Sequence, residues 1–91
     1  MYEIDLKVVN QFGIHARAAT CIVRLAAEYD EEVTINHQGN QAHARSLLEL
    51  LTLAAPKGSV VKLRISGSDE DSEKEVGEAF RDLFERGFYE S

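Results

Sequence analysis

The chain has 91 residues and a formal net charge of −6 at pH 7, with 44% hydrophobic and 29% charged residues. This size and composition predict one globular domain over residues 1–91, and the negative charge argues against a nucleic-acid partner. Cys21 is the only cysteine, which excludes an internal disulfide and a cysteine-based zinc site and suits a reducing, cytoplasmic compartment. No apolar run approaches the ~18 residues of a membrane span, so we expect no membrane insertion.

The first half of the chain predicts a strand, a helix and two further strands. Apolar residues at every second position from Tyr2 to Val8 predict a half-buried strand. After a loop over residues 10–13, helical spacing predicts a helix from Ala16 to Ala27. The segment 33–35 predicts a second strand, and turn residues 37–40 should lead into a short third strand.

A second helix is predicted directly after Ser46. Ser46 stands three residues before Glu49 and precedes an apolar run, which is the pattern of a capping box. Pro56 and Gly58 should end this helix after about two turns.

The last part of the chain predicts one strand and one long helix. Residues alternate between apolar and polar over 61–65, and a helix capped near Asp69 follows, with apolar spacings of three and four up to Phe84. The order β-α-β-β-α-β-α predicts the α+β class. We expect an open-faced sandwich, with three helices on one face of a four-stranded antiparallel sheet.

The stretch "GIHARAAT" at residues 13–20 places a histidine where a helix begins. His15 is a nucleophile that is partly unprotonated near neutral pH, and a helix N-terminus offers unpaired amides to phosphate oxygens. The backbone of Ala16 and Ala18 would supply such amides, and the Arg17 guanidinium matches a phosphate in geometry and charge. The spacing therefore favours a phosphohistidine site, although it also fits an ordinary exposed histidine beside a surface arginine.

The chain resembles the HPr family, the histidine phosphocarriers of the bacterial phosphoenolpyruvate-dependent phosphotransferase system, including the nitrogen-branch relatives. The family motif Gly-Leu/Met-His-Ala-Arg-Pro-Ala aligns with residues 13–19, and a second motif aligns with residues 45–53 and the Lys-Gly pair at 57–58. Both motifs keep the family's separation. Ala18 stands where the family usually has proline, which should slightly increase backbone freedom without preventing phosphorylation of His15.

The resemblance implies a phosphoryl relay. Enzyme I would phosphorylate Nδ1 of His15, Arg17 and the helix N-terminus would stabilise the phosphate, and an enzyme IIA-type domain would receive it. The protein would be a carrier rather than a stand-alone catalyst. We expect it to be a monomer, with no cofactor and no metal.

The resemblance also implies a partner-docking surface beside His15. Its expected members are Leu47, Leu48, Leu51, Arg24 and Thr20, with Arg17 and Arg45 completing a basic rim suited to acidic partners. Core packing is the competing interpretation of Leu48 and Leu51.

Ser46 has a structural and a regulatory interpretation. It should cap the second helix in either case. In relatives whose hosts have HPr kinase/phosphorylase, the matching serine is a regulatory phosphorylation site. The alternative function is therefore a regulatory paralogue that acts through phosphorylated Ser46 and a transcriptional regulator. A third hypothesis is a small domain that binds an anionic ligand at His15 and Arg17.

The remaining polar candidates have structural interpretations. We expect His37, at the hairpin turn, and His43, on the third strand, to be surface residues. Cys21 should be a half-buried packing residue of the first helix.

Overall fold

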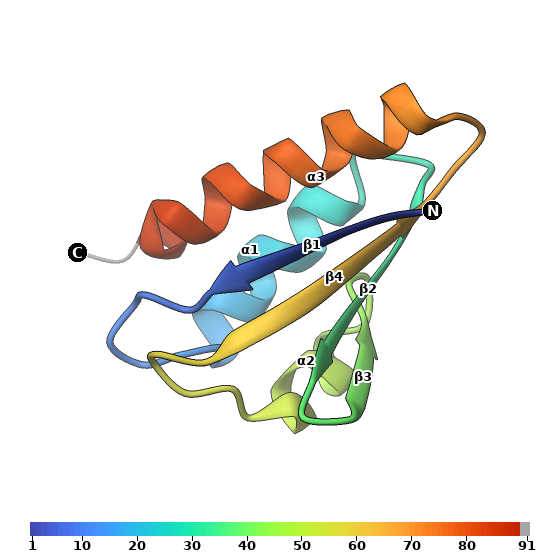
Figure 1. Ribbon diagram of the computed structural model, residues 1–91. Helices are drawn as coiled ribbons and strands as arrows, with labels where there is room; N and C mark the ends of the chain where they lie inside the picture. The colour runs from blue at the N-terminus through green and yellow to red at the C-terminus, as the bar shows by residue number, and fades with distance from the viewer. Residues whose placement is uncertain (90–91) are drawn as a thin grey trace.

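The computed structural model describes residues 1–89 (Figure 1). Its strands are β1 (Tyr2–Lys7), β2 (Glu32–His37), β3 (Asn40–His43) and β4 (Val60–Ser66). Its helices are α1 (Ala16–Ala26), α2 (Leu47–Leu53) and α3 (Glu70–Glu85), followed by a short 3₁₀ turn, η1 (Gly87–Tyr89). The predicted order of strands and helices is confirmed. Within residues 1–89, no helix is long and apolar enough to cross a membrane.

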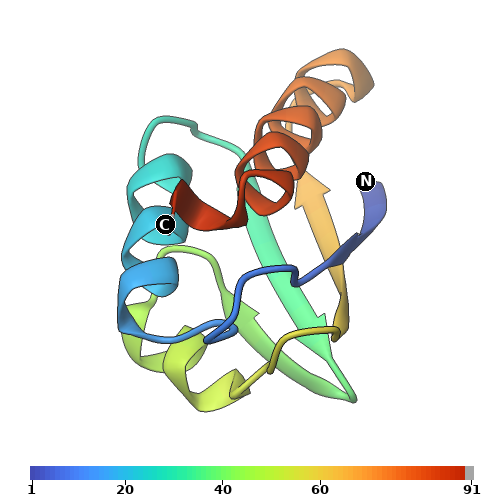
Figure 2. The same ribbon diagram turned by 90° about the vertical axis from the view of Figure 1, so that its left-hand side faces the viewer.

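The four strands form one antiparallel sheet in the order β1-β4-β2-β3. The period of two buries every second residue of β4, from Val61 to Ile65, against the helices. The opposite face is polar, and Arg64 forms an ion pair with Glu3 of β1 at 2.9 Å. Figure 2 shows the helices together on one side of the sheet. The predicted open-faced α+β sandwich is therefore confirmed.

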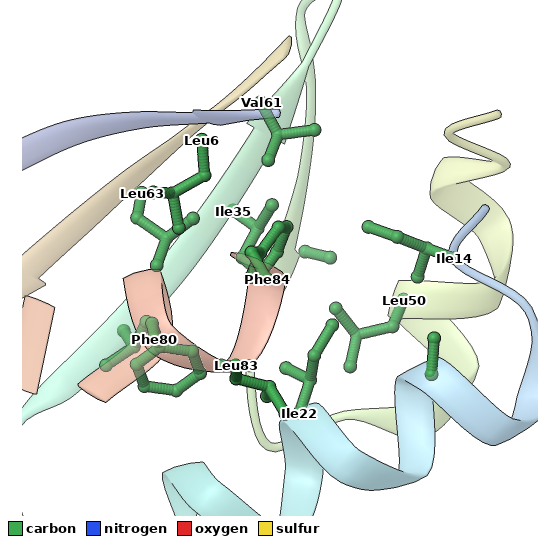
Figure 3. Packing of buried hydrophobic residues seen from close by; sticks show 14 of the residues in the cluster. Leu6, Ile14, Ile22, Ile35, Leu50, Val61, Leu63, Phe80, Leu83 and Phe84 are labelled. Carbon is green, nitrogen blue, oxygen red and sulfur yellow. The ribbon is translucent and has the colours of Figure 1, made fainter. Parts of the chain in front are cut away.

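The core lies between the sheet and the three helices (Figure 3). Phe80 and Phe84 of α3 are almost completely buried, and they face Leu63 of β4 on one side and Ile22 of α1 on the other. α2 joins this cluster through its two buried residues, Leu50, which is labelled in Figure 3, and Leu53. Burial of large apolar side chains from every layer fixes the position of α1 against the sheet.

The prediction that His37 is a surface residue is wrong. β2 continues through His37, which pairs with Asn40 across a two-residue turn, and the histidine is only 8% exposed. Side chains alternate along a strand, so His37 lies on the same helix-facing side as Val33 and Ile35. His43 is exposed on β3, as predicted.

The predicted capping box at α2 is half right. Ser46 Oγ accepts a hydrogen bond from the Glu49 amide at 3.2 Å, as a cap should. The Glu49 carboxylate, however, accepts a hydrogen bond from the amide of His43 instead of that of Ser46. The helix also ends earlier than Pro56 requires, because Ala54 adopts a left-handed conformation directly after Leu53.

Candidate functional site

His15 caps the N-terminus of α1 with its own ring. Its backbone is extended, with φ −107° and ψ −170°, and its Nδ1 accepts a hydrogen bond from the Arg17 amide at 3.3 Å. The carbonyl of His15 accepts the first intrahelical bond, from Ala19 at 2.8 Å. The ring nitrogen Nδ1 therefore lies at the positive end of the helix, beside amides without intrahelical acceptors.

The loop before His15 is held from two sides. Gly13 has φ +67°, and its carbonyl accepts hydrogen bonds from the His15 amide at 3.0 Å and from Asn10 Nδ2 at 2.7 Å. The Ile14 amide donates to the Ala55 carbonyl at 2.9 Å, which joins the loop to the segment that follows α2. These bonds fix the point at which the chain enters α1.

Phe12 contributes an aromatic contact to the site. Its ring meets the His15 ring edge-on, with centroids 5.6 Å apart and an interplanar angle of 79°. The side chain is 69% exposed, so burial in the core does not explain its position. Residues 10–13 were assigned only to a loop, so no role was predicted for Phe12 or Asn10. Two features could have drawn attention to them: an aromatic residue in a loop close to the histidine, and an asparagine three residues before a glycine.

The candidate residues of α1 lie along one side of the helix. Arg17 and Arg24 are seven residues apart, so they lie almost on one line about 10 Å long, and both are exposed. Within residues 1–89, no ion pair involves Arg17. Thr20, between them, donates its hydroxyl proton to the Ala16 carbonyl at 2.8 Å. The two guanidinium groups are thus open to an anionic partner. The Thr20 hydroxyl has already donated its proton, so it can only accept a hydrogen bond from a partner.

The first turn of α1 accommodates alanine at position 18, where the HPr motif usually has proline. Ala18 occupies the third helical position and is completely buried. Its amide, like that of Ala16, belongs to the first turn and has no intrahelical acceptor. The alanine side chain therefore fills the core, and its amide adds one donor to the helix N-terminus.

Three leucines of α2 are exposed together. Leu48 is 76% exposed, Leu47 is 43% exposed and Leu51 is 39% exposed, whereas Leu50 and Leu53 are buried. Core packing is therefore excluded as the explanation of Leu48 and Leu51. We call Leu47, Leu48 and Leu51 the leucine patch.

Arg45 does not belong to a basic rim around the leucine patch. Its guanidinium donates to the carbonyls of Ala26, at 3.4 Å from Nε, and Tyr29. These carbonyls lie at and just beyond the C-terminal end of α1, where a cation is favourable. The expectation that Arg45 faces a partner is wrong, because the side chain instead ties the β3–α2 connection to α1.

Glu49 links the start of α2 to β3. Its Oε1 lies 2.8 Å from the His43 amide and 2.9 Å from His43 Nδ1. The hydrogen bond to the carboxylate raises the pKa of His43 above its ordinary value, and the bond from the His43 amide lowers the pKa of Glu49. Ser46 caps the same turn, so its hydroxyl lies at a helix start that already holds a carboxylate.

The positions of the metal-ligating side chains decide whether the chain has a candidate metal site. Within the described part of the chain, no three His, Cys, Asp or Glu side chains gather where they could hold a metal ion.

Cys21 is half-buried and its thiol lies 3.6 Å from the Phe88 carbonyl, so it packs between α1 and the C-terminal turn, as predicted.

Comparisons with known proteins agree with this geometry. A family model described as the phosphorylation site of the PTS HPr component matches residues 2–86. Phosphocarrier protein HPr of Xylella fastidiosa (strain Temecula1) is 34% identical over 90 residues, which cover 99% of this chain and 98% of that protein. Phosphocarrier protein NPr of Shewanella violacea is 40% identical over 70 residues, or 77% of each chain.

The fold of the chain is also similar to that of solved HPr structures. A crystal structure of HPr from Thermoanaerobacter tengcongensis matches with a TM-score of 0.86 at 28% identity, over 100% of this chain and 99% of that chain. The family match spans nearly all of the sequence, and its phosphorylation-site description agrees with a histidine at a helix N-terminus. The chain therefore belongs to the HPr family, the phosphocarrier proteins of the phosphotransferase system.

Proposed function

We propose that the chain accepts a phosphoryl group from phosphorylated enzyme I on Nδ1 of His15 and passes it to an enzyme IIA-type domain. The observation that supports this proposal is the hydrogen bond between His15 Nδ1 and the Arg17 amide at 3.3 Å. A phosphate on Nδ1 would project into the group of amides that begins α1. The chain would hold the phosphoryl group only between its donor and its acceptor, so we propose a carrier and not a stand-alone catalyst.

The hydrogen bond to Nδ1 defines the nucleophile. Because Nδ1 accepts from the Arg17 amide, the proton of a neutral His15 ring is on Nε2. The Nδ1 lone pair forms the new N–P bond while the bond from phosphorus to the donor breaks and its electron pair stays on the donor. Nε2 then releases its proton to water, which removes the positive charge on the ring, and the donor takes up a proton from water. At 3.3 Å the existing bond is longer than is usual for N–H donors, so it breaks at low cost.

The helix N-terminus then stabilises the phosphate through charge and hydrogen bonds. The amides of Ala16, Arg17 and Ala18 lie in the first turn, where the helix dipole favours negative charge. The exposed Arg17 guanidinium adds donors that match phosphate oxygens. Water can take the place of the phosphate on these amides and on the guanidinium, which suits a phosphoryl group that must leave again.

The same part of the surface suits the proposed partners. The leucine patch would provide the apolar centre of an interface, and Arg17 and Arg24 would provide charges that attract acidic proteins. Thr20 lies between the two arginines at the edge of this surface. A carrier that docks on successive partners needs one open face, so we propose a monomer. The single free cysteine suits a reducing compartment, so we propose that it acts in the cytoplasm.

The regulatory alternative has less support from the chain. It requires a phosphate on Ser46, which here caps α2 next to Glu49. A phosphate there would be favoured by the N-terminus of α2 and opposed by the Glu49 carboxylate in the same turn. We therefore propose that Ser46 serves first as the helix cap.

The test is phosphate incorporation from phosphoenolpyruvate with enzyme I and Mg²⁺, followed by intact mass and phosphorus NMR. Wild type should gain one acid-labile phosphate, and His15→Ala should gain none. His43→Ala is the matched control, because it removes another exposed histidine and should leave incorporation unchanged. A phosphate that is acid-stable, or that His15→Ala retains, would rule the proposal out and redirect attention to Ser46.

A further inference from the structure

The loop that leads into α1 contains a buried polar side chain. Asn10 is only 6% exposed, although it belongs to a surface loop between β1 and α1. Its Nδ2 donates to the Gly13 carbonyl at 2.7 Å, and the Gly13 amide donates back to the Asn10 carbonyl at 3.2 Å. The loop is therefore closed on itself by hydrogen bonds at both ends.

The Gly13 carbonyl connects this closed loop to His15. The same oxygen that accepts from Asn10 also accepts from the His15 amide at 3.0 Å. The bond from the His15 amide sets the direction in which His15 leaves the loop, and with it the direction of the ring that caps α1. The Ile14 amide of the same peptide unit donates to the Ala55 carbonyl at 2.9 Å, so the bond from Asn10 Nδ2 is a second restraint on the Gly13 carbonyl.

We propose that Asn10 is a positioning residue for the phosphoacceptor, which acts on His15 through the Gly13 carbonyl. By fixing that carbonyl, the Asn10 amide holds Nδ1 in line with the Arg17 amide, where the phosphate is to be placed. The proposal deepens the proposed function and rests on it for its kinetic consequence. Its geometric consequence, the orientation of the unphosphorylated ring, holds independently.

A purely structural role is the competing explanation for Asn10. A β-carbon placed on Gly87 would lie 3.7 Å from the Asn10 Cβ, so the side chain also packs against the start of η1, the turn that follows α3. If packing were its only role, substitution would lower stability and leave the His15 ring unchanged. A decisive test must therefore include readouts on the ring itself.

The experiment compares wild type with two variants of Asn10. Asn10→Leu keeps the number and branching of the side-chain heavy atoms and removes the donor, and Asn10→Asp keeps the shape and lacks the donor when ionised. Gly39→Ala is the control for lost stability, because Gly39 lies in the distant β2–β3 turn with φ +84°. All four proteins are compared below their unfolding temperatures. The readouts are ¹⁵N shifts of the His15 ring and the single-turnover rate of phosphoryl transfer from enzyme I.

We expect both Asn10 variants to lose the Nδ1-acceptor signature of His15 and to transfer roughly 10- to 100-fold more slowly, as a slightly misplaced reacting atom would. The Gly39→Ala control should keep both properties. Ring shifts equal to those of wild type, or transfer rates within about twofold of it, would overturn the proposal. If wild type itself took up no phosphate, the proposed function would fail, and the ring shifts alone would still decide the role of Asn10.

Discussion

Replacement of Gly13 by alanine tests how the site is held together. A β-carbon at this position would lie 2.3 Å from the Ala55 carbonyl oxygen and 2.9 Å from Pro56 Cα. Both neighbours are backbone atoms, so neither can rotate away as a flexible side chain would. The loop before His15 must then separate from the segment after α2.

The size of the effect follows from two contributions. A non-glycine residue at φ +67° costs roughly 1–2 kcal/mol. Separation of the segments also breaks the 2.9 Å bond between the Ile14 amide and the Ala55 carbonyl, and an unsatisfied buried group costs about 1–3 kcal/mol. Gly13→Ala should therefore lower the free energy of unfolding by about 2–5 kcal/mol, a large part of the ~5–15 kcal/mol of a small domain.

Denaturant unfolding measures this loss, and Gly39→Ala separates the two contributions. Gly39 also has positive φ, but a β-carbon there would meet nothing within 4 Å, so this control should lose only the backbone contribution of roughly 1–2 kcal/mol. Gly13→Ala should also transfer phosphate more slowly, because His15 is displaced. Equal losses for the two variants would refute the argument that close approach of the two segments holds the loop.

Three further predictions concern residues around α2. Arg45→Ala should lower the free energy of unfolding by roughly 1.5 kcal/mol in a denaturant titration, because the α1 carbonyls lose a charged donor. Leu50→Ala should cost about 2–5 kcal/mol, whereas Leu48→Ala should change stability by less than about 0.5 kcal/mol and slow transfer between partners. In an NMR titration, Glu49→Gln should return the raised pKa of His43 towards its ordinary value. Stabilisation by this pair should be complete between the ordinary pKa values of Glu49 and His43. It should be lost as the pH rises through the raised pKa of His43, and lost again as the pH falls through the lowered pKa of Glu49.

Features that depend on neighbours in the sequence were predictable. His15 and Ser46 both stand directly before a helical pattern, and both cap the helix that follows. The alternation along β4 gave its buried face correctly. Local backbone preferences and side-chain periodicity determine these features, so they can be inferred without knowledge of the fold.

Features that depend on distant segments were not predictable in the same way. Arg45 donates to carbonyls at residues 26 and 29, and no local pattern distinguishes it from an arginine that makes no such hydrogen bonds. The Glu49 carboxylate had two acceptable donors, and the folded position of β3 selected the His43 amide. His37 was assigned to the turn because the strand was predicted to end at Ile35, whereas β2 continues through His37 and keeps the same alternation of faces.

The candidate site shows both kinds of feature. The sequence places His15, Arg17 and the helix start next to one another, so the group that we propose to bind phosphate could be predicted before the fold was known. The role of Asn10 was not visible, because it depends on the closed shape of a loop that the sequence identifies only as a loop.

The central claim is that the phosphate resides on Nδ1 of His15 at the start of α1. The most direct measurement is NMR of the phosphorylated protein labelled with ¹⁵N in histidine and in the backbone. We expect phosphorus coupling to Nδ1 of His15 and a large shift of the Arg17 amide as its acceptor changes from the ring to a phosphate oxygen. Coupling to Nε2, or an Arg17 amide that does not respond, would contradict the claim.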